Sequence, residues 1–210
     1  MFRKFANALA IVFHPVFMGT MVLLAFAAKR DGLPVSYMLI AMALILLFTL
    51  VIPVAGTYLL HKDIHLKNRS QRFWPLVITF ISHVTLYFML KPFYSQKLLM
   101  IGVILLTINL LVLFAFTSFI KASMHANAIT IVMCIYIIAY GILTNGQLLN
   151  FQSVPAGFYL SFGILFLLFC ITIWQRLVSE AHTLSELIAG FFSGLASVGL
   201  TLIYIERFGF

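Results

Sequence analysis

The stretch 176–190 carries the polar side chains best suited to chemistry in this sequence. It reads RLVSEAHTLSELIAG and lies between two long apolar segments. His182 and Glu186 are four residues apart, so in a helix they would share one face, a turn from each other. The carboxylate can then accept the imidazole N–H, fix its tautomer and raise the basicity of the other nitrogen. Arg176, expected near the start of that helix, can hold an oxyanion by two parallel hydrogen bonds.

A second interpretation of this stretch remains open. A charged loop between two membrane helices would also carry these residues, with His182 simply satisfied by a hydrogen bond.

Gly190 lies one helical turn beyond Glu186 and allows close helix approach. Gly190 and Gly194 form a G-x-x-x-G step, which we expect to pack within the bundle rather than to pair two chains.

The composition places this stretch in a membrane protein. The chain has 210 residues, of which 63% are hydrophobic and 9% charged, whereas a soluble domain is roughly a quarter charged. A chain of this length cannot bury so much apolar surface in its own core, so we expect an all-α, polytopic bundle of transmembrane helices. The net charge of +8 sits at membrane edges, where it can bind anionic lipid headgroups. We therefore expect the lipid bilayer, and no nucleic acid, as a partner.

The apolar runs predict about six or seven spans in a single domain over residues 1–210, with a motif-bearing core at about 61–205. Ala25 to Ala27 mimics a signal-peptidase site, but the run around it is long for a signal peptide, so we expect a retained first span. The predicted spans are 6–28, 37–60, 76–90, 98–120, 128–143, 158–174 and 187–205.

Three polar breaks follow the second, fourth and sixth predicted spans, so all three should emerge on the same membrane face. The breaks are Lys67 to Arg72, Ser123 to His125, and Arg176 to Glu186. Each precedes a predicted helix, whose N-terminus would direct free N–H groups and the positive end of its dipole toward that face. Helix N-termini with these properties bind anions such as phosphate.

The side chains in the three breaks suit phosphoryl-ester hydrolysis without a metal or another cofactor. Cations there can hold a phosphate; they are Lys67, Arg69, Arg72 and Arg176. The breaks also hold two histidines, His125 and His182. One can attack phosphorus and the other can protonate the leaving oxygen. His61 and His65 have the spacing of a helical metal pair, but two histidines without further ligands do not predict a metal site.

These residues also resemble the motifs of the type 2 phosphatidic acid phosphatase superfamily. The third stretch, Arg176-x5-His182-x3-Glu186-x3-Gly190, resembles that family's third motif, in which an aspartate stands at the position of Glu186.

The other two motifs follow in the family's order. The Ser-Met-His tripeptide at 123–125 resembles the Pro-Ser-Gly-His motif, and the stretch K-x4-R-x2-P at 67–75 resembles the Lys-x6-Arg-Pro motif in a shorter form. The resemblance extends from residue 67 to residue 190.

The resemblance implies a role for each matched residue. His182 would attack phosphorus and form a phosphohistidine, and Glu186 would orient it. His125 would be the general acid for the leaving group and the base in the second step. The phosphate would be held by Lys67, Arg72, Ser123 and Arg176, with Arg69 as a substitute for Arg72.

The implied substrate is a lipid phosphate that enters the site sideways from the bilayer. Candidates are phosphatidate, phosphatidylglycerol phosphate, polyprenyl diphosphate and lipid A phosphate. Family members usually act on the outer face, so we expect an integral protein of a bacterial plasma membrane with its site outside. The positive-inside rule does not decide the orientation, because without the four phosphate-binding cations the two faces carry similar charge. Oligomeric state cannot be read from the sequence.

Two other function classes fit the same chain. A lipid or anion transporter, such as a flippase, would also place buried cations and polar helix breaks in a membrane, and it predicts polar residues that face each other at mid-membrane depth. An inactive relative that binds anionic lipid would tolerate loss of His182.

Overall fold

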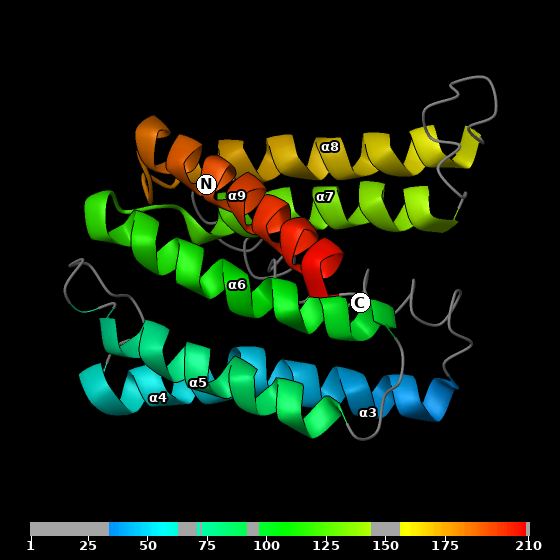
Figure 1. Ribbon diagram of the computed structural model, residues 1–210. Coiled ribbons are helices and arrows are strands. Elements are labelled where there is room, and N and C mark those ends of the chain that lie inside the picture. Colours follow the sequence, from blue (N-terminus) through cyan, green and yellow to red (C-terminus); the bar gives the residue numbers. More distant parts are fainter. Residues whose placement is uncertain (1–33, 63–70, 72, 92–96, 144–155, 209–210) are drawn as a thin grey trace.

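The computed structural model describes residues 34–62, 71, 73–91, 97–143 and 156–208, and all the elements within them are helical. One continuous rod comprises α3 (Val35–Leu46), the π-helical turn η1 (Leu47–Val51) and α4 (Ile52–His61). The other helices are α5 (Phe73–Leu90), α6 (Lys97–Phe119), α7 (Met124–Leu143), α8 (Ala156–Val178) and α9 (Leu184–Phe208) (Figure 1). The predicted all-helical class is confirmed for these ranges, and the predicted span 6–28 lies outside them.

Five of the described helices are long and apolar enough to cross a membrane, by length and composition. They are the rod Val35–His61, α5, and the apolar parts of α6, α8 and α9. α7 contributes a shorter apolar stretch, Met124–Ile138. Many large apolar side chains on the outside of the bundle are exposed, as expected of surfaces that face lipid. These features indicate an integral membrane protein.

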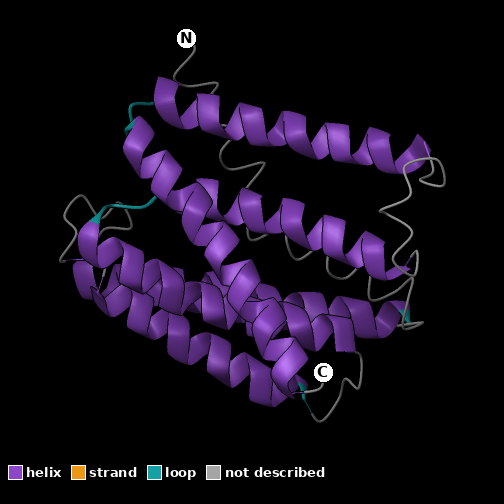
Figure 2. Ribbon diagram, turned by 45° about the horizontal axis from the view of Figure 1, so that its top comes forward, coloured by secondary structure: helices purple, strands orange, loops and turns teal. Residues whose placement is uncertain are grey.

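The helix ends that flank the polar breaks gather at one end of the bundle. α5 packs against α4 and α6, α8 lies along α7, and α9 crosses both α6 and α7. The last turns of α4, α6 and α8 and the first turns of α5, α7 and α9 all lie at the left of Figure 1. Figure 2 shows the same bundle with its upper helices brought forward. The expectation of a common face is confirmed for these described helix ends.

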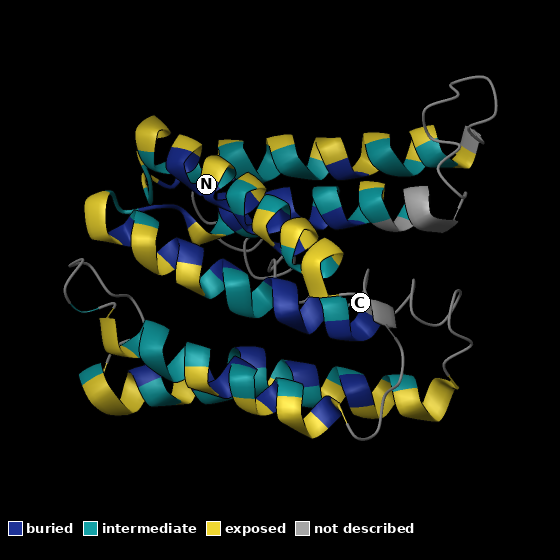
Figure 3. Cartoon of the chain, in the orientation of Figure 1, coloured by how far each residue is buried: buried dark blue, intermediate teal, exposed yellow. Residues whose placement is uncertain are grey.

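α9 buries most of its small residues and exposes most of its large ones. Its buried face includes Ala189, Gly190, Ser193, Gly194 and Ser197, whereas Ile188, Phe192, Leu195 and Leu202 are exposed (Figure 3). Lipid tails are as apolar as leucine, so membrane helices associate through close packing and hydrogen bonds rather than by hiding apolar surface. A Cβ added to Gly194 would lie 2.8 Å from the Asn127 carbonyl oxygen in α7. The glycine step therefore packs within the bundle, as predicted.

A buried polar cluster ties α6, α7 and α9 together. The Asn109 side-chain oxygen in α6 accepts hydrogen bonds from Asn127 Nδ2 in α7 and from Ser197 Oγ in α9, each at 2.9 Å. Asn127 Nδ2 also donates to Ser193 Oγ at 2.9 Å. Hydrogen bonds between membrane helices contribute about 1 kcal/mol each, so this cluster fixes how α9 crosses its two neighbours.

Candidate active site

Arg176 lies in the last turn of α8, whereas the sequence had placed it near the start of the next helix. The helix ends at Val178, beyond its predicted end at residue 174, and Glu180, two residues later, has a left-handed φ of 54°. In this C-terminal cap, the Glu180 N–H donates to the Leu177 oxygen at 3.0 Å, and the Ala181 N–H donates to the Arg176 oxygen at 3.2 Å. The cap satisfies two terminal carbonyl groups and turns the chain toward α9.

His182 lies in the turn before α9 rather than on a helix, yet it meets Glu186 as expected. The two side chains approach at 2.8 Å between Nδ1 and Oε2. Glu186 also completes a capping box, because its Oε2 accepts the Thr183 N–H at 3.2 Å while Thr183 Oγ1 accepts the Glu186 N–H at 3.4 Å. The contact forms because the first turn of α9 folds the carboxylate back over the preceding residues, not because the pair shares a helical face.

This contact fixes the protonation pattern of the His182 ring. A carboxylate only accepts hydrogen bonds, so Nδ1 carries the proton and Nε2 keeps its lone pair in the neutral ring. The His182 side chain is 7% exposed and the Glu186 side chain 17%. The arrangement is that of an oriented imidazole whose Nε2 is a nucleophile or a base.

The loop between α6 and α7 lies against the start of α9. The Ser123 N–H donates to the Glu186 carbonyl oxygen at 2.9 Å, and Ser123 Oγ accepts the Ala126 N–H at 3.4 Å, which caps α7. A Cβ at Gly190 would lie 2.4 Å from the Ser123 carbonyl oxygen. A glycine at 190 therefore permits the contact that joins the second and third predicted motifs.

The remaining predicted site residues are distributed as follows. α7 begins at Met124, four residues before its predicted start, so His125 lies half-buried in its first turn rather than in a loop. Ser123 is fully buried and caps the helix, so its contact with a phosphate stays a prediction. The cations of the first motif and the second histidine of the suggested metal pair lie outside the described residues; they are Lys67, Arg69, Arg72 and His65.

Sequence reasoning singled out neither Lys121 nor Gln175. Lys121, in the loop before α7, is close enough for its charge to act on the His182 ring. Gln175, next to Arg176, is 2% exposed and its Nε2 has no hydrogen-bond partner among the described residues. The sequence did contain a signal for Lys121, because it is a cation two residues before Ser123. Gln175 was overlooked because the predicted span ended one residue before it.

Burial lowers the pKa of His182 below its usual value of 6.5, and this is the largest influence on the ring. The hydrogen bond to Glu186 and its negative charge oppose the change, whereas the positive charges of Arg176 and Lys121 add to it. The net result is a ring that stays neutral at neutral pH, which is the form that can act as a nucleophile.

The lowered pKa predicts the acid side of the pH–rate profile. The acid limb of activity, which reports neutral His182, should lie below pH 6.5, and activity should fall as the pH drops through the lowered pKa of the free enzyme. Replacing Lys121 by methionine removes a positive charge, so the pKa should rise and the acid limb should move to higher pH. Measuring kcat/KM from pH 4 to 8 for both proteins tests this. An acid limb at the same pH in both would show that Lys121 is not part of the site.

Replacing Gly190 by alanine should damage both the fold and the site. The added methyl group would meet a backbone oxygen at 2.4 Å and the Ala126 Cβ at 3.0 Å, so α9 or the Ser123 loop must move. Overpacking of this kind costs about 1–3 kcal/mol. We expect a lower unfolding temperature in detergent and lower activity. Gly199→Ala is the matched control, because a Cβ there meets nothing within 4 Å; equal behaviour of the two variants would contradict the close contact.

No protein-family model matches the chain, and no curated protein or solved structure matches it. The inference of function therefore depends on the residues themselves. They define an integral membrane protein with an oriented histidine beside two cations at one end of a helix bundle.

Proposed function

We propose that this protein is a membrane phosphatase that hydrolyses a lipid phosphate monoester or diphosphate through a phosphohistidine intermediate, as a divergent type 2 phosphatidic acid phosphatase. The observation that supports the proposal most strongly is the 2.8 Å contact between His182 and Glu186 beside the charges of Arg176 and Lys121. A neutral, oriented imidazole can attack an electrophile. Two nearby cations make an anionic phosphoryl group its natural target.

In the first step, His182 Nε2 forms a bond to phosphorus while the bond from phosphorus to the lipid oxygen breaks. His125 gives its proton to that oxygen, and the lipid alcohol, or the lipid monophosphate from a diphosphate, leaves. Glu186 stabilises the positive charge that develops on the His182 ring. Arg176 and Lys121 hold the phosphoryl oxygens, with the first-motif cations as further candidates.

In the second step, a water molecule attacks the phosphohistidine and His125, now neutral, takes its proton. The phosphorus–nitrogen bond breaks, inorganic phosphate leaves, and His182 Nε2 regains its lone pair. His125 then carries the proton that the next turnover needs, so each cycle consumes one water and returns both histidines to their starting states.

The membrane setting supports a lipid as the substrate. His182 follows α8 and precedes α9, so it lies where membrane helices end. In a bundle of six or seven spans, with 6–28 as the first, the headgroup of a lipid would reach this level while its tails stay between helices. We propose a bacterial plasma membrane, with the site on its outer face.

Phosphate release from a panel of lipids tests the proposal. The purified protein in detergent with EDTA would be incubated with phosphatidate, phosphatidylglycerol phosphate, a polyprenyl diphosphate and a lipid A phosphate. We expect release from at least one lipid, and a phosphoprotein, trapped by rapid quenching, that is stable in alkali and labile in acid. The same purification from cells that lack the protein is the control. No release from any of the four lipids would contradict the proposal.

The buried cluster of Asn109, Asn127, Ser193 and Ser197 supports a lipid or anion transporter as the second candidate. Asn109 in α6 and Ser193 and Ser197 in α9 lie well inside their helices, as a permeation path requires, whereas Asn127 lies in the first turn of α7. Most of their hydrogen bonds join one another, as in structural cross-links between helices. Flux of labelled phosphate or lipid across proteoliposomes, with no phosphate release, would favour the transporter.

A further inference from the structure

Gln175 has an unpaired hydrogen-bond donor in the interior of a membrane protein. Its side chain is 2% exposed, and Nε2 has no partner among the residues that the structure describes. Leaving a buried donor unpaired is unfavourable, and most buried polar groups are paired, so such groups call for an explanation. Methionine or leucine would fill a similar volume without this cost.

Two ring contacts locate Gln175 at the level of the candidate active site. Tyr136 in α7 stacks on Phe158 in α8 with ring centroids 5.6 Å apart. At the helical rise of about 1.5 Å per residue, Gln175 lies about 26 Å along α8 from Phe158, and Ser123 lies about 20 Å from Tyr136 in the same direction. α8 therefore reaches the level of Ser123 about one turn before Gln175, which lies about 6 Å further toward the end of the helix.

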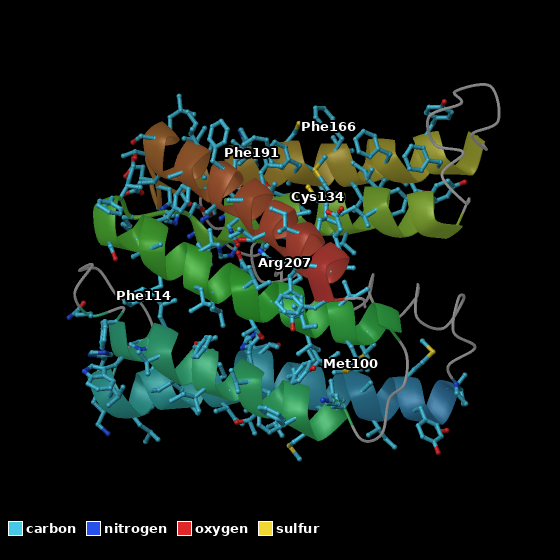
Figure 4. The ribbon with its side chains drawn as sticks, viewed as in Figure 1. Met100, Phe114, Cys134, Phe166, Phe191 and Arg207 are labelled. Carbon is cyan, nitrogen blue, oxygen red and sulfur yellow. The ribbon has the colours of Figure 1, made fainter. Side chains whose placement is uncertain are left out.

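The contact between α8 and α9 gives the same level. Phe169 in α8 and Phe191 in α9 have ring centroids 6.0 Å apart, and Figure 4 labels Phe191 on α9. From that contact, Gln175 lies about 9 Å further along α8, and Glu186 lies about 8 Å back along α9. Gln175 is thus in the same layer as Glu186, and its burial places it on the inner side of α8.

The neighbouring groups in this layer are donors and cations. Arg176 Nε is also buried without a partner among the described residues. The Lys121 charge acts on His182 from the α6–α7 loop. The carboxylate of Glu186 is already engaged by His182 and Thr183. Unpaired donors in the same layer as cations suit a ligand that is rich in acceptors and negatively charged.

We propose that the Gln175 side-chain amide belongs to the phosphate-binding site and donates from Nε2 to a non-bridging phosphate oxygen. The inference rests on the proposed function for its natural substrate, but the binding of the anion itself can be tested separately. A neutral donor adds a hydrogen bond without adding charge. It therefore holds the phosphate without lowering the pKa of His182 further, whereas another cation would lower it.

The test compares wild type with Gln175→Met, which keeps a similar volume and removes the donor. Unfolding temperature in detergent would be measured with and without inorganic phosphate, which stabilises a protein that binds it. We expect Gln175→Met to unfold at the same temperature as wild type or higher without phosphate, because the unpaired donor is gone. We expect its apparent Kd for phosphate to be about tenfold weaker or more, as for loss of a hydrogen bond to a charged group.

Two results would overturn the inference. Unchanged phosphate binding would show that Gln175 does not touch the anion. A lower unfolding temperature without phosphate would show that the amide has an internal partner or a bound water instead. If Gln175→Met does not fold, Gln175→Asn withdraws the donor by one methylene and must weaken phosphate binding. Lipid hydrolysis is measured in parallel, so wild type that binds phosphate but cleaves no lipid would contradict the proposed function and leave this inference intact.

Discussion

Replacing His182 by alanine is expected to reduce phosphate release from the best lipid substrate by at least about 10³-fold. The variant has no nucleophile, and the remaining cations can only bind and polarise the phosphate, which leaves a small residual acceleration. The acid-labile phosphoprotein should disappear completely. Rates of inorganic phosphate release and rapid-quench labelling measure the two effects on the same preparations.

Thr183→Ala is the matched control for this variant. Thr183 is adjacent to His182 and caps α9 through the Glu186 N–H at 3.4 Å, but the proposed mechanism gives it no part in chemistry. Loss of an N-cap costs about 1 kcal/mol, so the unfolding temperature should fall while most of the activity remains. If the His182→Ala protein still forms the phosphoprotein, the nucleophile is another residue.

The helices were predictable because long apolar runs have few other folds open to them in a membrane. Their ends were less predictable, as α7 and α8 show. α7 starts at Met124 because Ser123 caps it, and α8 continues through Gln175 and Arg176 to the left-handed cap at Glu180. A prediction from hydropathy alone ends each helix at its last apolar residue and therefore omits those final turns.

The site was predictable where it depends on local spacing. His182 and Glu186 meet through a capping box, which the Thr-x-x-Glu pattern at 183–186 encodes over a few residues. The contact between Ser123 and Gly190 depends instead on how α9 crosses α7, which no local pattern reveals. The same crossing assembles the Asn109 cluster from isolated polar residues within three apolar helices.

Replacing Glu186 by glutamine is expected to separate the structural and the chemical contributions of this residue. Glutamine is accepted at position N3 of a capping box, so α9 should start as before and the unfolding temperature should stay close to that of wild type. The neutral amide cannot stabilise the charge that develops on His182, and it does not fix one tautomer. We therefore expect kcat to fall by on the order of 10²–10⁴-fold, as when the carboxylate that orients a catalytic histidine is neutralised.

The pH profile distinguishes this loss from a general disturbance of the site. Glu186 raises the pKa of His182 through its hydrogen bond and its charge, whereas Lys121 lowers it. The residual activity of Glu186→Gln should therefore have its acid limb at lower pH than wild type, and Lys121→Met should have its limb at higher pH. Unfolding of the turn would lower the unfolding temperature and the rate together. Limbs that move in the same direction in both variants would contradict the charge arrangement around His182.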